Sequence, residues 1–408
     1  MNYPKIKIVN GRIITPYRII NGGTVLTEGH RILAVAEDDI PAPDAMVIDA
    51  QGQYIAPGFI DIHVHGGGGS DFMDGDAEAF LTVAETHMRY GTTSMVPTTL
   101  SSDTESLRQA VRTYESAHLR NTKGASFLGM HLEGPYFAMN QRGAQDPRFI
   151  RNPDPAEYTA VLENTNAVVR WSAAPELPGA LDFGSYLRSK NILPAIAHTD
   201  AIYEEVLEAW EHGYTHATHL YSAMSGVTRR NAFRYAGVIE SAFLLDDMTV
   251  EIIADGVHLP PALLKLVYKF KGPEKTALIT DAMRAAGMPP GESILGDRRN
   301  GLKVIVEDDV AKLPDRSSFA GSVATCDRLV RNMVKLAEVP LADAVRMMTG
   351  TPAAIMKVSG TKGSLATGKD ADIVLFDSDI NIDTVIINGE IRHRSETARS
   401  ILREPVSD

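Results

Sequence analysis

Two histidines separated by one residue, His63 and His65, end an apolar run that is typical of a β-strand. Side chains two apart on a strand point to the same face, so both imidazoles can bind one ion. Polar side chains also stand at the ends of later apolar runs: Glu133, His198, His219, Asp255 and Asp281. Imidazoles and carboxylates suit a divalent ion, with Zn²⁺ favoured and Fe²⁺, Mn²⁺ and Co²⁺ as alternatives. The residue types therefore predict a metal site.

The chemistry that such a site supports is the hydrolysis of an amide. A bound divalent ion lowers the pKa of its water from ~16 towards ~7 and polarises a carbonyl group. We predict that Asp281 is the acid/base that takes a proton from this water and hands it to the leaving nitrogen. A helix N-cap before residues 282–286 is the other role open to Asp281. His131 is expected to support the ligands, and His216 to be structural.

The elements that must position these residues alternate between short apolar runs and longer helical periods. Eight strands are predicted, over Phe59–His65, Thr93–Pro97, Ser126–Glu133, Val168–Ala173, Leu193–His198, Thr215–His219, Thr249–Asp255 and Thr276–Asp281. Helical spacing lies between most of them, over Ala77–Tyr90, Thr104–His118, Pro155–Asn164, Ala201–His212 and Pro260–Tyr268. Eight such units predict a closed (β/α)8 TIM-like barrel, with its active site at the C-terminal ends of the strands.

The two ends of the chain have a different pattern, in which short alternating runs are separated by Asn-Gly, Gly-Gly and Pro-rich turns. An Asn-Gly turn follows an apolar run at both ends, at Asn10-Gly11 and at Asn388-Gly389. We therefore predict an α/β protein of two domains. Residues 1–56 and 363–408 would form a small β-sandwich, and residues 57–362 the hydrolase barrel.

Composition narrows the class of protein and its partners. A hydrophobic content of 44% with 23% charged residues is typical of a soluble globular enzyme. The formal net charge of −12 disfavours nucleic acid and anionic membrane surfaces as partners. The single cysteine excludes an intrachain disulfide, and no apolar stretch approaches the ~18 to 20 residues of a membrane span. A cytoplasmic location is expected.

Six motifs resemble the amidohydrolase superfamily and, within it, the deacetylases of N-acetylated amino-sugar 6-phosphates. They are Pro57-Gly58-Phe59-Ile60-Asp61-Ile62-His63-Val64-His65-Gly66, His131-Leu132-Glu133-Gly134-Pro135, His198-Thr199-Asp200-Ala201, Thr218-His219-Leu220, Ala254-Asp255-Gly256-Val257-His258 and Thr280-Asp281-Ala282-Met283. The likeness extends over nearly the whole chain. It implies hydrolysis of N-acetylglucosamine 6-phosphate, a small phosphosugar, to glucosamine 6-phosphate and acetate.

The resemblance also implies roles for single residues. Glu133, His198 and His219 match the principal metal ligands, and Asp281 matches the acid/base. Because some members of the family lack the His-x-His pair and work with one ion, the pair in this chain leaves one or two ions per subunit open.

Substrate contacts follow from the same resemblance. His258 matches a residue that contacts the sugar. Arg230 matches an arginine that reaches the phosphate bound to a neighbouring subunit, which implies a homodimer.

Three departures from the family pattern lie in the expected substrate pocket. Gln145, followed by Asp146, stands where a histidine usually polarises the acetyl carbonyl, and an amide can donate a hydrogen bond but carries no charge. Ser222, beside Ala223, replaces an asparagine near the phosphate, and residues 228–232 replace the usual segment around the phosphate arginine. Gln145, Ser222 and Ala223 are thus expected to contact the substrate.

These departures leave two alternatives open. The first keeps the amide hydrolysis and changes the substrate to N-acetylgalactosamine 6-phosphate or an unphosphorylated N-acyl compound. The second is a non-catalytic binding protein on the same scaffold.

Overall fold

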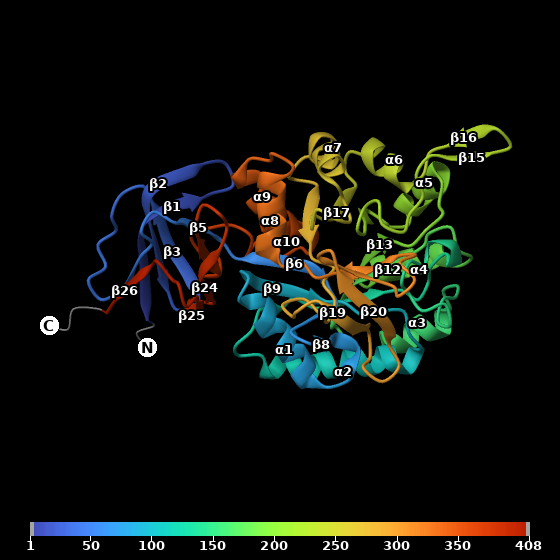
Figure 1. Ribbon diagram of the computed structural model, residues 1–408, viewed down its shortest axis with the longest axis horizontal. Helices are drawn as coiled ribbons and strands as arrows, with labels where there is room; N and C mark the ends of the chain where they lie inside the picture. Colours follow the sequence, from blue (N-terminus) through green and yellow to red (C-terminus); the bar gives the residue numbers. More distant parts are fainter. Residues whose placement is uncertain (1–3, 405–408) are drawn as a thin grey trace.

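The structure is a computed structural model that describes residues 4–404, so the ends of the predicted sandwich domain, residues 1–3 and 405–408, lie outside the described residues. Figure 1 shows a barrel with surrounding helices and, beside it, a sheet in which the blue N-terminal and red C-terminal strands lie together. Within residues 4–404, none of the helices has the length and apolar character needed to cross a membrane.

The barrel is built from parallel strands: β6 (Phe59–Val64), β9 (Thr92–Pro97), β10 (Ser126–Phe127), β11 (Met130–Glu133), β12 (Val168–Ala173), β13 (Leu193–Ile196), β14 (His216–Ala217), β17 (Thr249–Ile253) and β18 (Thr276–Ile279). They pair in the orders β10-β9-β6 and β11-β12-β13-β14-β17-β18. Backbone hydrogen bonds join these two sets, from Thr99 N to His131 O at 3.0 Å and from Asp281 N to His63 O at 2.9 Å. The predicted (β/α)8 barrel is confirmed.

Most of the strands are shorter than predicted, and the difference matters for the site. The predicted third strand is broken at Gly129, whose φ of 125° takes the chain out of the ladder between β10 and β11. His198, His219 and Asp281 lie just beyond their strands with positive φ angles of 47°, 28° and 47°. Such backbone conformations are costly for residues other than glycine and often occur at functional sites.

The helices cover the outside of the barrel. Those expected from periodicity are α1 (Ala77–Met88), α2 (Thr104–Arg120), α3 (Pro155–Val161), α5 (Tyr203–Glu211) and α7 (Pro261–Lys271). Aspartate side chains cap the first three, because Asp76, Asp103 and Asp154 each accept a hydrogen bond from a backbone N–H of the first turn. Between residues 4 and 404 the structure has five further α-helices that were not predicted: α4 (Ala180–Ser189), α6 (Val238–Leu244), α8 (Cys326–Lys335), α9 (Leu341–Met348) and α10 (Gly350–Ile355).

The terminal segments form one hydrogen-bonded sheet. Its strands are β1 (Lys5–Ile14), β2 (Ile19–Glu28), β3 (Arg31–Ala36), β4 (Met46–Asp49), β5 (Tyr54–Pro57), β23 (Ile373–Phe376), β24 (Ile382–Ile387), β25 (Glu390–Arg394) and β26 (Ile401–Arg403). The order is β25-β24-β23-β5-β1-β2-β3, with β4 paired to β1 and β26. A core of its own, including Ile8, Ile48 and Ile373, holds this sheet together. The domain boundaries themselves stay a prediction.

Two insertions extend from the C-terminal side of the barrel. An antiparallel sheet follows β18 and consists of β19 (Gly291–Leu295), β20 (Leu302–Glu307), β21 (Val310–Lys312) and β22 (Phe319–Ser322). Ser322 N donates to Asp281 O at 2.8 Å, which fixes β22 beside the end of β18. The second insertion is the hairpin of β15 (Thr228–Arg230) and β16 (Phe233–Tyr235), which projects away from the barrel in Figure 1.

Candidate metal centre and active site

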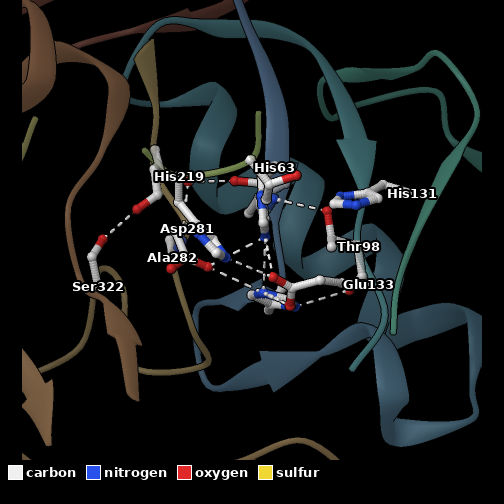
Figure 2. Close-up of polar contacts among 12 residues, drawn as sticks. His63, Thr98, His131, Glu133, His219, Asp281, Ala282 and Ser322 are labelled. Carbon is white, nitrogen blue, oxygen red and sulfur yellow. Dashed lines mark hydrogen bonds and ion pairs between the residues drawn. The ribbon is translucent and has the colours of Figure 1, made fainter. Parts of the chain in front are cut away.

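Glu133, the last residue of β11, lies at the centre of the predicted metal site. Its Oε1 is 3.0 Å from His219 Nε2 and 3.4 Å from His198 Nε2, and its Oε2 is 3.4 Å from His65 Nε2. His63 Nε2 is 3.5 Å from Glu133 Oε1. Two candidate ligand groups therefore share Glu133: one with His63 and His65, the other with His198 and His219. Figure 2 shows side chains of this centre converging on the Glu133 carboxylate.

The outer ring nitrogens of three of these histidines have acceptors that orient the rings. Nδ1 lies 2.8 Å from a Glu251 oxygen for His63, 3.2 Å from Thr98 O for His65 and 2.8 Å from Gln141 O for His198. Because these acceptors require a proton on Nδ1, Nε2 is the ring nitrogen that faces the centre and can bind a metal ion once it is deprotonated. Oriented imidazole nitrogens around buried carboxylates are the donor set of a divalent metal ion, so the residues fit one.

Burial and neighbouring groups shift the pKa values of the side chains at this centre. Burial opposes ionisation of Glu133, but the surrounding histidines outweigh it and hold the pKa of Glu133 well below its usual range. Burial likewise opposes protonation of His65, but Asp281 and Glu133 raise its pKa to about 9. Neutral His131 is favoured, because burial lowers its pKa well below the usual value. Its Nε2 is 2.6 Å from Ser172 Oγ, and it lies outside both ligand groups.

Asp281 lies at the edge of the centre. Its Oδ1 is 3.1 Å from His65 Nε2 and 3.5 Å from His63 Nε2. Burial would raise the pKa of Asp281, but the hydrogen bond with His65 and the nearby imidazole of His63 lower it overall. The suggested N-cap role is wrong, because residues 282–286 form a bridge to Ser322 and turns rather than a helix. The carboxylate is therefore free to face the centre.

A cavity of about 280 Å³ opens over this centre. The predicted residues that line it are His65, Glu133, Gln145, His198, His219, Ser222, Ala223, His258 and Asp281. His63 lies beneath the cavity and has no exposed surface. Arg230 is exposed on the β15–β16 hairpin and does not line this cavity. The sequence patterns missed Leu295 and Ser318, which the inserted sheet brings to the cavity together with Phe319.

His258, on the cavity wall, is paired with Asp255. Asp255 Oδ2 is 2.7 Å from His258 Nδ1, and Asp255 Oδ1 accepts the backbone N–H of His258 at 2.8 Å. The ring of Phe319 packs against His258 with ring centroids 4.7 Å apart. Asp255, which follows a barrel strand like the metal-centre residues, therefore orients His258 and does not join the metal centre.

Two buried residues that sequence reasoning missed lie inside the barrel. Arg170 of β12 and Glu251 of β17 form an ion pair of 2.6 Å with no exposed side-chain surface. Glu251 also contacts His63 and His216, at 2.8 and 3.2 Å. A signal was present, because each is the single charged residue in a buried, mainly apolar strand.

A parallel barrel with histidines and carboxylates gathered at the ends of its strands defines the class of the protein. Residues 54–392 match the amidohydrolase family. The chain belongs to this family, and the predicted enzyme class is confirmed.

Among the similar proteins of this family are deacetylases of amino-sugar 6-phosphates. An N-acetylglucosamine-6-phosphate deacetylase of Bacillus subtilis (strain 168) is 32% identical over 394 residues, covering 95% of this chain and 97% of the relative. An N-acetylgalactosamine-6-phosphate deacetylase of Escherichia coli O157:H7 is 33% identical, covering 85% of this chain and 89% of the relative.

A solved structure supports the same placement. The deacetylase of Mycobacterium smegmatis, an aspartate-to-alanine mutant in complex with N-acetyl-D-glucosamine 6-phosphate, superposes with a TM-score of 0.87 at 30% identity. The match covers 96% of this chain and 100% of that one. The suspected relationship to N-acetylglucosamine-6-phosphate deacetylases is thus confirmed.

Proposed function

We propose that this enzyme hydrolyses the N-acetyl group of N-acetylglucosamine 6-phosphate, releasing acetate and glucosamine 6-phosphate. The observation that carries the proposal is the position of Asp281 Oδ1, 3.1 Å from His65 Nε2 at the edge of a centre built around Glu133. This arrangement places a proton-transfer group beside a metal-binding donor set. The relatives named for this activity support the choice of substrate.

In this proposal Glu133, His198 and His219 hold one divalent ion, and His63, His65 and Glu133 hold a second. Such an ion supplies Lewis acidity for the amide carbonyl and acidifies water. Zn²⁺ is the favoured ion, since the donor set is mainly imidazole. Asp281 accepts the proton of the attacking water at a carboxylate oxygen and then donates it to the amide nitrogen, because an amide anion is a poor leaving group.

Other residues of the cavity position the substrate. The Nε2 amide of Gln145 carries two hydrogens and uses one on Glu133, so the other can donate to the acetyl carbonyl oxygen. His258, oriented by Asp255, presents Nε2 to a sugar hydroxyl. Ser222 and Ala223 form the wall beside them.

We assign the phosphate to Arg230 of a neighbouring subunit. In its own chain Arg230 stands exposed on the projecting hairpin, with its guanidinium 5.5 Å from the ring centre of Tyr235. An arginine on such an arm can reach a second copy and bind phosphate in a bidentate manner. A homodimer is therefore part of the proposal.

Acetate release from three substrates tests the proposal. Purified Zn²⁺-loaded enzyme is assayed side by side on N-acetylglucosamine 6-phosphate, N-acetylgalactosamine 6-phosphate and unphosphorylated N-acetylglucosamine. We expect the highest kcat/KM on the first. A higher kcat/KM on N-acetylgalactosamine 6-phosphate would instead favour the activity for which the Escherichia coli relative is named. Equal kcat/KM values on N-acetylglucosamine with and without the 6-phosphate would show that the enzyme does not recognise the phosphate.

A further inference from the structure

Beneath the metal centre lies a buried ion pair that the proposed reaction does not use. Arg170 Nη1 donates to Glu251 Oε2 at 2.6 Å, and Arg170 Nη2 donates to Glu251 Oε1 at 2.8 Å. Both side chains are fully buried, and neither lines the cavity over the centre. Burying such a pair rarely adds stability over apolar residues of similar volume. Its contacts with the ligand groups point to a role in the site.

Glu251 holds the ring of His63 from behind. Its Oε1 lies 2.8 Å from His63 Nδ1. An ionised carboxylate only accepts hydrogen bonds, so the His63 proton resides on Nδ1 and the Nε2 lone pair faces Glu133 and Asp281. Acceptors of this kind fix the tautomer and the ring plane of a histidine that binds metal.

The same pair touches the second ligand group only through its backbone and a neighbouring hydroxyl. Glu251 Oε1 accepts the backbone N–H of His219 at 3.3 Å, and Arg170 Nη2 donates to Thr218 Oγ1 at 2.7 Å. The ring of His198 is held elsewhere, by Gln141 O. The side-chain contact is thus confined to the group that contains His63.

We propose that Glu251, itself held in place by Arg170, is the positioning residue that makes the group of His63, His65 and Glu133 able to bind a second ion. Without the acceptor behind it, His63 is free to rotate or to carry its proton on Nε2, and that group loses a ligand. The group of Glu133, His198 and His219 keeps its ligand rings. This inference concerns metal binding, so it does not depend on which sugar is the substrate.

Two double variants separate the acceptor from the ion pair. Arg170→Met with Glu251→Leu removes both charges and the acceptor. Arg170→Met with Glu251→Gln removes the same charges, but the glutamine Oε1 can still accept from His63 Nδ1. Replacing both members of the pair avoids leaving a single uncompensated charge in the core, so both variants are expected to fold.

The readouts are Zn²⁺ bound per chain at defined free Zn²⁺, and the ¹⁵N NMR signals of the histidines in metal-free and Zn²⁺-loaded protein. We expect two ions in the natural protein, with the leucine variant binding the second ion at least ~10-fold more weakly. The glutamine variant should recover most of that affinity. The His63 signals should report a proton on Nδ1 in the natural protein and a mixed population in the leucine variant.

A second buried pair provides the control. Lys362 and Asp372 lie 2.5 Å apart with 10% and 7% of their side-chain surfaces exposed, outside both ligand groups. The double variant Lys362→Met with Asp372→Asn should retain two ions. Unchanged affinity for the second ion in the leucine variant would overturn the proposal, and so would an equal loss in the control. Neither readout uses a sugar, so a wrong substrate assignment would leave the result standing.

Discussion

Gln145 bridges Glu133 and the backbone of Ser101: its Nε2 donates to Glu133 Oε2 at 2.7 Å, and its Oε1 accepts the Ser101 N–H at 2.8 Å. Both hydrogen bonds are buried. A side chain held at both ends of its amide presents its remaining N–H in one direction. The position that departs from the family pattern is therefore tied directly to the metal centre.

Replacing Gln145 by alanine should impair both activity and stability. Loss of a preorganised donor at a developing oxyanion typically lowers kcat by ~10² to 10³-fold. The Ser101 N–H also loses its partner, which costs about 1–3 kcal/mol of unfolding free energy. Steady-state kinetics and urea unfolding measure the two effects. Gln109→Ala on helix α2 should change neither, and an unaltered kcat in Gln145→Ala would rule out the donor role.

Asp281→Asn should abolish most of the turnover while leaving metal binding nearly intact. General acid–base catalysis contributes ~10² to 10⁴-fold, and asparagine cannot accept and pass on a proton. The measurements are kcat and Zn²⁺ content. Asp343→Asn is the control, because Asp343 accepts a hydrogen bond from Tyr268 and lies outside the cavity lining. Undiminished turnover in Asp281→Asn would remove this aspartate from the mechanism.

Replacing the shared ligand Glu133 and replacing His65 should lower the amount of bound metal by different amounts. Glu133 belongs to both candidate groups, whereas His65 belongs to one. We expect about two Zn²⁺ per chain in the natural protein, one in His65→Ala and well under one in Glu133→Gln, because removing the carboxylate weakens both sites. Elemental analysis after dialysis measures the number of Zn²⁺ ions per chain in each variant. Equal metal loss in the two variants would contradict a shared Glu133.

Arg230→Ala should raise KM for the phosphorylated sugar without much effect on kcat. A lost charge-assisted hydrogen bond of about 1.5–3 kcal/mol corresponds to a ~10 to 100-fold change in KM. The neighbouring Arg229 points to the opposite face of β15, so Arg229→Ala is the matched control. Turnover of the unphosphorylated sugar should be unchanged in both. A KM increase of the same size on both sugars would exclude phosphate binding by Arg230.

Sequence reasoning located the barrel and the candidate ligands because their signals are local. Glu133, His198, His219 and Asp281 each follow an apolar run, and the ends of parallel barrel strands meet at one face. Counting these runs was enough to predict the closed barrel and the residues that the structure gathers around one cavity. Alternation along a strand is a weaker guide to the direction of a side chain that lies beyond the end of its strand. Strand β14 ends at Ala217, and His219 has a positive φ, so alternation no longer governs its direction.

The amino-acid sequence by itself determined which side chains stand at the strand ends and which family motifs carry them. Tertiary structure alone decided which residues support those side chains from inside the barrel and which segments close the cavity over them. Arg170 and Glu251 are 81 residues apart, and only barrel closure brings their charges together beneath His63. The inserted β19–β22 sheet likewise reaches the cavity through long-range pairing with the end of β18. Contacts between distant segments leave no periodic trace in the chain, because they depend on how strands close in space.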